Sequence, residues 1–352
     1  PRHPEQHVKR HPARQYSDSK EIMNTTSRPL RAAMIGAVLL ALVGCAATPT
    51  SEPTPTAAAA ESTFPRTIAV PAGASTEATT LEIPKEPQRI AALTYETAEL
   101  VVTLGATDRL VMIPAAAQNP ALTNHLDEMS GIENVAPTES TTNAEAVIAL
   151  APDLVLMSAR HGLEDGAGLA LAAAGIPVLV LPNSWATIDD MTTNIALVGQ
   201  AIGADAESVE LASTIEAGLK ATTAEGTAPR VLVLSNQAGR PFVTAGKAFP
   251  LELLRLAGAV DASVDLGMTS TGPITVEQVV AAAPDAVLLI DMNGSGERLF
   301  APVLENPAVA AMPAMSAGRV LLVTGNQVQA LGLGATVSGL AHELPSADRA
   351  TV

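Results

Sequence analysis

Two arginines are candidate ligand-binding residues in a chain that has few basic side chains. The sequence contains 20 Lys and Arg against 36 Asp and Glu, with a net charge of -16. Arg160 and Arg240 each follow an apolar run that predicts a strand, at Leu154–Met157 and Val231–Leu234. A guanidinium at such a position can bind a carboxylate or a hydroxamate-type oxygen through two parallel hydrogen bonds. A surface ion pair in an acidic protein is the alternative, and the sequence leaves both interpretations open.

Three aromatic residues occupy similar positions. Aromatic residues make up only 2% of the chain, with 1 Trp, 2 Tyr and 4 Phe. Tyr95 and Trp185 each come shortly after a predicted strand, and Phe242 follows closely after Arg240. Because the core must be built from Ala, Val and Leu, aromatic side chains in these loops favour contact with a large planar or aromatic ligand. Simple core packing is the alternative.

The sequence lacks the motifs of common enzymes. It contains no Gly-x-Ser-x-Gly elbow, Walker loop or His-Glu-x-x-His pair. After the N-terminal segment only His125, His161 and His342 remain as histidines. Because Cys45 is the single cysteine, an internal disulfide and a cysteine-based zinc cluster are excluded. We therefore predict that the chain is not an enzyme.

The charge balance also argues against nucleic acid as a partner. Binding to a phosphate backbone needs clustered Lys and Arg, whereas this chain carries an excess of Asp and Glu. We therefore expect a partner of another class.

Strand and helix patterns alternate along the chain and position these residues. Continuous apolar runs predict strands at Arg89–Leu93, Leu110–Ile113, Leu154–Met157, Val178–Leu181, Val231–Leu234, Ala286–Ile290 and Val320–Val323. Helical spacing predicts helices at Glu96–Leu104, Ala144–Leu150, Gly168–Ala174, Leu251–Ala257, Val276–Ala282 and Leu333–His342. Such alternation is typical of α/β sheets covered on both faces. Ligands of open α/β sheets lie outside the carboxyl ends of the strands, where the arginines and aromatic residues fall.

A stretch without strand patterns, 188–225, separates two series of elements and is expected to form linking helices. Its first part ends at Gly203, and Asp205 can cap a second helix from Ala206 to about Ala224, which would be about 28 Å long. We expect this helix to join an N-terminal α/β lobe, 67–187, to a C-terminal α/β lobe, 226–344, with a ligand cleft between them. The last residues, 345–352, are interpreted as a tail.

One segment is repeated between the two series. The run from Glu145 to Leu156, Glu-Ala-Val-Ile-Ala-Leu-Ala-Pro-Asp-Leu-Val-Leu, is matched without gaps by Glu-Gln-Val-Val-Ala-Ala-Ala-Pro-Asp-Ala-Val-Leu from Glu277 to Leu288. In each copy a helix ends at Ala-Pro-Asp, because proline keeps the preceding residue out of the α region, and a buried strand follows. Two matching copies predict two similar lobes.

These features together resemble the helical-backbone class of periplasmic binding proteins, which includes binders of ferric siderophores, haem and cobalamin. The resemblance covers about Thr67 to Leu344 and rests on both repeats, on Pro87–Leu93 with Leu104–Leu110, and on Ala174–Val178. It implies two Rossmann-like lobes joined by a single long backbone helix.

The resemblance also implies a function, the substrate-binding component of an ABC importer. Such a component would capture an iron chelate, either a ferric siderophore or haem, and deliver it to a membrane permease and its ATPase. Cobalamin binding, or a surface lipoprotein that uses the fold without transport, are the alternatives. No intrinsic cofactor is expected, and the protein is expected to be a monomer.

The resemblance further assigns roles to individual residues. Haem-binding relatives use Tyr or His as axial ligands, so Tyr95 and His161 are candidates if the ligand is haem. One acidic residue per lobe docks such proteins onto the permease, and Glu145 and Glu277 match that pattern. Alternatively, both glutamates are first-turn residues favoured by the helix dipole. Binding of a bare divalent metal is not expected, because the His-rich loop of zinc and manganese binders is absent.

The N-terminal part predicts a lipid anchor. Met23 is interpreted as the true start and residues 1–22 as an upstream extension. Residues 23–44 contain an apolar run of about a dozen residues, fewer than the roughly 20 that span a bilayer, which is typical of a secretory signal. The run ends in Leu-Val-Gly-Cys, which looks like the lipobox of bacterial lipoproteins, so Cys45 is the predicted lipidation site of an extracytoplasmic, membrane-anchored protein. Residues 45–66, rich in Thr, Pro and Ala, predict a flexible tether.

Overall fold

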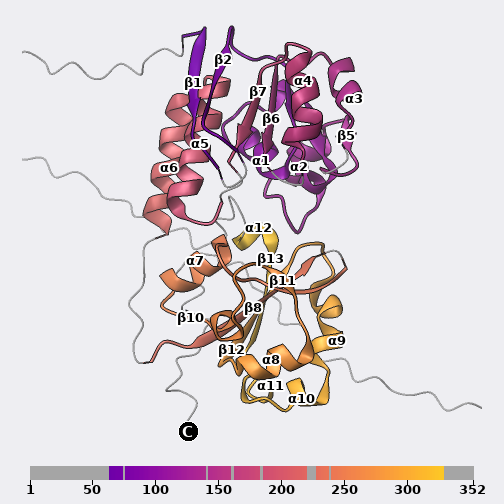
Figure 1. Cartoon of the computed structure of the whole chain (residues 1–352), viewed down its shortest axis with the longest axis vertical. Coiled ribbons are helices and arrows are strands. Elements are labelled where there is room, and N and C mark those ends of the chain that lie inside the picture. The colour runs from indigo at the N-terminus through magenta and orange to yellow at the C-terminus, as the bar shows by residue number, and fades with distance from the viewer. Residues whose placement is uncertain are drawn as a thin grey trace, which may run out of the picture. The chain divides into compact units, whose positions relative to one another are not determined.

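Two separate sheets carry most of the helices, as the two series of patterns predicted (Figure 1). The computed structural model describes residues 63–73, 76–139, 142–159, 162–182, 185–219, 227–237 and 239–328. All of them belong to one compact unit, Ala57–Val352. The predicted signal peptide with Cys45, the upstream extension and the C-terminal tail lie outside the described residues, as does the predicted helix Leu333–His342.

The first sheet has five parallel strands in the order β5-β4-β3-β6-β7. The strands are β3 (Ile90–Ala92), β4 (Leu110–Pro114), β5 (Val135–Ala136), β6 (Leu154–Ser158) and β7 (Val178–Leu181). The helices are α1 (Tyr95–Thr103), α2 (Leu126–Ser130), α3 (Ala144–Ala149) and α4 (Leu169–Ala173). Every residue of β3 and β6 is buried, which explains why these strands are continuous apolar runs and show no alternation. The α/β prediction is confirmed for this lobe.

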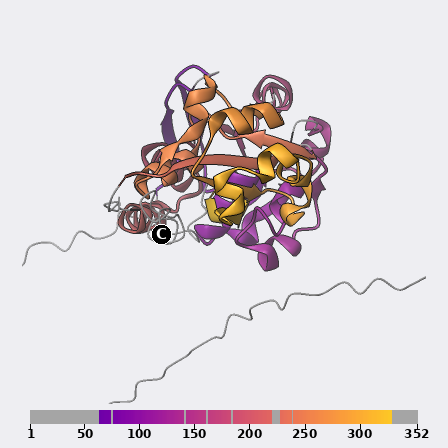
Figure 2. The same cartoon turned by 90° about the horizontal axis from the view of Figure 1, so that it is seen from below.

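The second sheet is mixed, in the order β11-β9-β8-β12-β13, with β10 also paired to β8. Figure 2, seen from below, shows the orange and yellow elements of this lobe nearest the viewer. The strands are β8 (Arg230–Gln237), β9 (Arg240–Val243), β10 (Val260–Asp261), β11 (Gly272–Pro273), β12 (Ala286–Asp291) and β13 (Val320–Thr324). The helices are α7 (Phe249–Leu256), α8 (Val276–Ala282), α9 (Ala301–Leu304), α10 (Pro307–Ala310), α11 (Pro313–Ser316) and α12 (Gly325–Val328). Strands β8, β12 and β13 are parallel, whereas β9 pairs antiparallel to both β8 and β11.

The antiparallel hairpin β8-β9 corrects one expectation from the sequence. The segment after Leu234 was expected to be a cleft loop, because Ser, Asn and Gln follow it. Strand β8 instead continues to Gln237, and a tight turn containing Gly239, whose φ is 78°, leads into β9. In the hairpin Gln237 pairs with Arg240 and Ser235 pairs with Phe242. Glycine fits the turn because it adopts positive φ without a steric cost.

The segment between the lobes forms two helices, α5 (Ile188–Ile202) and α6 (Asp205–Gly218), in agreement with the linking helices predicted over 188–225. In Figure 1 they lie beside an antiparallel pair, β1 (Arg66–Val70) and β2 (Thr79–Ile83), which the sequence patterns did not predict. Helix α6 ends at Gly218, earlier than predicted, and is about 21 Å long. Residues 220–226, which lead toward β8, lie outside the described residues, so a helix that joins the lobes stays a prediction.

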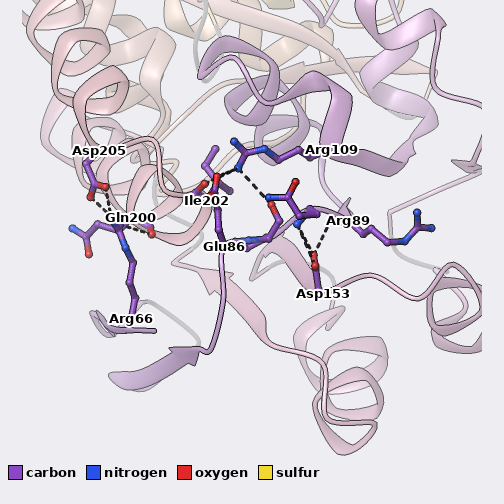
Figure 3. A network of polar contacts seen from close by, with 10 residues as sticks. Arg66, Glu86, Arg89, Arg109, Asp153, Gln200, Ile202 and Asp205 are labelled. Atoms are coloured by element: carbon purple, nitrogen blue, oxygen red, sulfur yellow. Dashed lines mark hydrogen bonds and ion pairs between the residues drawn. The ribbon is translucent and has the colours of Figure 1, made fainter. Parts of the chain in front are cut away.

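Two arginines, Arg66 and Arg109, bind the end of helix α5 and the start of α6 (Figure 3). The sequence predicted that Asp205 caps α6, but Asp205 does not cap this helix. It accepts two hydrogen bonds from the guanidinium of Arg66, at 2.9 and 2.6 Å, so Arg66 belongs to the folded lobe and not to the tether. Arg66 also donates to the carbonyl of Gln200, and Arg109 donates to that of Ile202, both at 2.9 Å. Cationic donors thus satisfy carbonyls in the last turn of α5.

The repeated segment has the same backbone geometry in both lobes. Among the described residues, the non-glycine residues with positive φ are Ala151, at 47°, and Ala283, at 40°, and both occupy the Ala of Ala-Pro-Asp. This left-handed conformation is unfavourable for alanine, so neighbouring groups must hold the chain there. The repetition of this backbone conformation confirms that the two copies are structurally equivalent.

In each repeat, the Asp of Ala-Pro-Asp binds the start of a neighbouring strand and so stabilises the turn between the helix and the strand that follows it. Asp153 accepts hydrogen bonds from the backbone N–H groups of Gln88 and Arg89 (Figure 3), and Asp285 accepts one from that of Arg230. The side chains of the two arginines, Arg89 and Arg230, bind this turn in the same way. The guanidinium of Arg89 donates to the carbonyls of Leu150 and Ala151, and that of Arg230 donates to those of Ala282 and Ala283.

Replacement of Asp153 by Asn should destabilise the protein at neutral pH. Burial by itself raises the pKa of Asp153, but the N–H groups of Arg89 and Gln88 and the Lys85 ammonium lower it, and the net pKa lies below 3.8. A lowered pKa means that the carboxylate stabilises the fold above about pH 4 and that this contribution is lost as the pH falls through the folded-state value. We expect a loss of about 1–3 kcal/mol at pH 7.

Urea unfolding at pH 7 and at about pH 3 measures this effect. The difference between wild type and Asp153→Asn should be larger at the higher pH than at the lower, because the contribution of the carboxylate is lost as the pH falls toward and through its lowered pKa. Asp127→Asn on the exposed surface of α2 serves as the control and should change little. An equal loss of unfolding free energy at both pH values would show that the charge of Asp153 does not stabilise the turn.

Candidate functional site

A cleft of about 920 Å³ is lined by residues of both lobes. Four of its lining residues come at or just after the carboxyl ends of parallel strands, namely Tyr95 after β3, Trp185 after β7, Gln237 in β8 and Met292 after β12. This is where open α/β sheets bind ligands. The volume falls within the range of roughly 300–1,000 Å³ that is typical of small-molecule sites. The cleft is therefore the candidate binding site.

Aromatic side chains from both lobes line this cleft. Tyr95 and Trp185 line it from the first lobe, and Phe249, the first residue of α7, lines it from the second. Tyr95 and Trp185 therefore lie in one cleft, although Tyr95 is only 8% exposed and also packs in the core, and their contact with a ligand stays a prediction. Phe249 is not among the residues predicted from the sequence, because helical spacing predicts a helix that begins two residues later, at Leu251. In a chain with 2% aromatic residues, three of them line a single cavity.

Hydrogen bonds fix the two aromatic residues of the first lobe. The indole Nε1 of Trp185 donates to the hydroxyl of Ser158, at the buried end of β6, over 3.3 Å. Tyr95 is the first residue of α1, and its backbone N–H donates to the carboxylate of Glu139 at 2.8 Å. Burial raises the pKa of Glu139, and the N–H of Tyr95 opposes that rise. These bonds hold the Trp185 ring and the backbone of Tyr95 before a ligand enters, which reduces the ordering cost of binding.

Lys247 is the only cation among the described residues that line the cleft. It lies in the exposed segment before α7, directly after Gly246, whose φ is 75°. A Cβ at Gly246 would collide with the backbone of Thr269, so only glycine allows this close approach. Two carboxylates, Glu96 and Asp190, also line the cleft. Asp190 already accepts the backbone N–H of Thr187 in the capping box of α5.

A buried polar network shapes the second lobe's wall of the cleft. Asp291, at the end of β12, accepts hydrogen bonds from the side chain of Asn236 and from the backbone N–H of Gly296, at 2.7 and 2.6 Å. Burial alone would raise the pKa of Asp291, but Asn236 and the N–H groups of the loop lower it below its usual value of 3.8. Asn236 also accepts the N–H of Met292. The network thereby sets the position of Met292 in the cleft.

Hydrogen bonds connect the two lobes beside the cleft. The side chain of Asn119 donates to the carbonyl of Met292 at 2.9 Å. Asn326 donates its backbone N–H to the carbonyl of Ala121 at 2.8 Å, and its side chain to that of Thr123 at 3.2 Å. These bonds tie the segment after β4 to the ends of β12 and β13.

The structure does not bring all predicted ligand-binding residues to the cleft. Arg240 and Phe242 lie on β9, where the guanidinium stacks 5.2 Å from the centre of the Phe242 ring, and neither lines the cavity. The hairpin places both residues on β9, away from the cleft. Arg160 and His161 lie outside the described residues.

The two predicted docking glutamates occupy equivalent exposed positions. Glu145 is the second residue of α3, after the N-cap Asn143, and Glu277 is the second residue of α8, after the N-cap Thr275. Its own backbone N–H and the hydroxyl of Thr275 lower the pKa of Glu277, so this carboxylate is charged at neutral pH.

Within the described part of the chain, the His, Cys, Asp and Glu side chains form no group of three or more that could hold a metal ion. None of its helices is long and apolar enough to cross a membrane.

Comparisons with known proteins agree with this architecture. A family model for "Periplasmic binding protein" matches residues 90–326. The ABC transporter substrate-binding lipoprotein YvrC of Bacillus subtilis (strain 168) is 28% identical over 271 residues, which cover 74% of this chain and 81% of YvrC. A cobalamin-binding protein of Halobacterium salinarum is 27% identical over 260 residues, or 71% of this chain and 67% of the relative.

Among solved structures, the haem-binding protein RhuT from Roseiflexus sp. RS-1 in its apo form superposes with a TM-score of 0.61. It is 22% identical and covers 73% of this chain and 97% of its own. This likeness concerns the fold, and the family match extends over more than half of the chain. The chain belongs to the periplasmic binding protein family, whose members are solute-binding proteins and not enzymes.

Proposed function

We propose that this chain captures an iron chelate, a ferric siderophore or haem, as the substrate-binding component of an ABC importer. The proposal rests on the observation that Tyr95, Trp185 and Phe249 all line one cleft of about 920 Å³. Aromatic faces contact large planar or aromatic ligands well, and a cavity of this size suits a bulky ligand better than a bare ion. The chelate would lie between the lobes, in contact with both.

Polar groups around the aromatic wall would orient the chelate. Lys247 would pair with an anionic substituent, such as a carboxylate of haem or a catecholate oxygen of a siderophore. Gln237 offers both a donor and an acceptor from the second lobe. If the chelate is haem, the phenol oxygen of Tyr95 is the candidate axial ligand among the described residues, and His161 is the candidate outside them.

Delivery would involve a permease and its ATPase, with the protein held at the membrane surface by a lipid on Cys45. The exposed Glu145 and Glu277 would dock the two lobes onto basic side chains of the permease. The relative YvrC is named as a lipoprotein, which supports the anchor.

Cobalamin is the second candidate ligand. Sequence relatives in Halobacterium salinarum and Vibrio campbellii are named as cobalamin-binding and vitamin B12-binding proteins, at 27% and 24% identity. A corrin ring is also large and planar, so the same aromatic wall would suit it.

Thermal unfolding of the lipid-free protein in the presence of a ligand panel tests the proposal. The panel contains ferric enterobactin, ferrioxamine B, haemin, cyanocobalamin and molybdate. We expect an iron chelate to raise the melting temperature, because a ligand present at 100 times its Kd stabilises the folded state by about 2.7 kcal/mol. Stabilisation by cyanocobalamin or molybdate alone, or by no compound, would overturn the iron-chelate proposal.

A matched pair of variants sharpens the same experiment. Lys247→Gln should weaken binding of an anionic chelate about tenfold or more, whereas Lys247→Arg should retain most of the affinity because it keeps the charge. Lys247 is exposed, so both variants should unfold at the wild-type temperature without ligand.

A further inference from the structure

The charged side chains of the cleft are divided between its two walls. Glu96, the second residue of α1, lines the cleft together with Asp190, in the first turn of α5, and α5 packs against α1. Lys247 lines the cleft from the second lobe. Neither Asp190 nor Lys247 forms an ion pair with another described residue, so no such pair neutralises these two charges. Among the described lining residues, one wall therefore carries carboxylates and the other an ammonium group.

Glu96 occupies a buried position that an apolar residue would fill with less cost to the fold. It is only 3% exposed, and every residue of α1 from Tyr95 to Val102 is buried. Burial of a carboxylate is unfavourable unless other groups compensate it, whereas burial of an apolar side chain is favourable. The helix dipole favours a glutamate in a first turn, but it acts equally on exposed residues. The carboxylate of Glu96 is therefore better explained by the cleft that it lines than by the stability of the fold.

The aromatic residues of the same cleft independently favour a cationic ligand group. Tyr95, Trp185 and Phe249 line the cavity that Glu96 and Asp190 also line. The face of an aromatic ring carries partial negative charge and attracts a cation, and this attraction is stronger where water is excluded. Carboxylates and aromatic rings around one cavity are thus the surroundings that suit a protonated amine.

We propose that the ligand carries a protonated amine, which binds Glu96 and Asp190 beside the aromatic rings. This inference rests on the proposed function and narrows it to siderophores whose ferric complex bears an ammonium group. The oxygen-rich iron centre would lie toward Lys247, so the division of charge between the walls would orient the complex. Haem, which has carboxylates and no amine, and strongly anionic ferric catecholates would meet like charges at Glu96 and Asp190, which weakens binding.

Isothermal titration with a matched pair of ligands tests this proposal. Ferrioxamine B ends in a free amine that is protonated at neutral pH, whereas its N-acetyl derivative is the same ferric complex without that charge. The wild-type protein should bind ferrioxamine B about tenfold or more tightly than the derivative.

Variants that remove charge and keep size assign this preference to the two carboxylates. Glu96→Gln and Asp190→Asn should each reduce the preference, and the double variant should bind both complexes equally. Asp189→Asn is the matched control, because Asp189 is the exposed neighbour of Asp190 on α5 and does not line the cleft. The control should keep the wild-type preference. Lys247→Gln should weaken binding of both complexes by the same factor, because the iron centre is common to them.

The outcomes separate this inference from the proposed function. Equal affinity of the wild type for the two complexes, or tighter binding of haemin or ferric enterobactin than of ferrioxamine B, would overturn the ammonium site and leave the iron-chelate proposal standing. Failure of every iron chelate to bind would overturn both. A full preference for the amine in the folded double variant would overturn the assignment to Glu96 and Asp190. If thermal unfolding without ligand shows that Glu96→Gln loses the fold, Asp190→Asn alone decides, since Asp190 is only half-buried.

Discussion

Cells that carry Glu145→Ala together with Glu277→Ala should lose uptake of the ligand, although the purified variant binds it normally. Both carboxylates are exposed at the second position of equivalent helices, so neither supports the core. Charged groups at the edge of an interface affect association far more than the stability of the fold. We expect ligand affinity and melting temperature to stay near the wild-type values while uptake falls about 100-fold or more.

A control of the same structural kind excludes an effect of the helix dipole. Glu128 in α2 and Glu207 in α6 are also exposed first-turn glutamates. Their double replacement by Ala should leave uptake unchanged at matched protein level. Normal uptake by the Glu145→Ala, Glu277→Ala strain would mean that these residues are only helix stabilisers.

Loss of the aromatic wall should abolish tight ligand binding. Tyr95→Ala and Trp185→Ala each remove a ring that lines the cleft, and the Trp185 ring also donates a hydrogen bond to Ser158. Truncation of a central aromatic contact costs about 2–4 kcal/mol of binding energy, so we expect affinity to fall about 30-fold to 1,000-fold. Isothermal titration with the compound that stabilises the wild type gives the measurement.

Conservative variants separate the contributions of the rings from those of their polar atoms. Trp185→Phe keeps an aromatic face but loses the hydrogen bond to Ser158, and should retain most of the affinity. Tyr95→Phe should also bind well if the ring only stacks, and should lose binding and alter the visible spectrum if its oxygen is an axial ligand of haem. Unchanged affinity in both alanine variants would show that the ligand lies elsewhere.

The single tryptophan offers an independent readout of the same site. Trp185 is the only Trp in the chain, so its emission reports on the cleft alone. Titration with an iron chelate should quench this emission, and the emission should stay constant with a compound that does not raise the melting temperature.

Features that depend on local sequence were predictable. The α/β class, most strands and the repeat followed from apolar runs, helical spacing and Ala-Pro-Asp, because each acts on neighbouring residues in the chain. Helix Val276–Ala282 was predicted with both ends correct, since Thr275 caps its start and Ala283 ends it in the left-handed conformation. The pair of strands β1 and β2 was not predicted, although the buried Ile68 and Val70 alternate with exposed residues, which is the pattern of a half-buried strand.

The consequences of two turns were not predicted. Polar residues at the end of β8 resemble a loop, yet their hydrogen bonds to β9 extend the sheet and place Arg240 and Phe242 away from the cleft. Conversely, Lys247 and Phe249 reach the cleft because the segment after β9 folds back at Gly246. Gly239 and Gly246, both with positive φ, are local signals of these turns, but they do not indicate which side chains the turns bring to the cleft.

The sequence by itself therefore determined the class of fold, the presence of two similar lobes and the positions of Tyr95 and Trp185 after strands. Those properties arise from periodicity and from residues that stop helices, which act over a few positions. Only the tertiary structure decided which side chains share one cavity and which repeated side chains remain exposed, such as Glu145 and Glu277. Burial and strand register depend on contacts between segments far apart in the chain, and no local pattern contains that information.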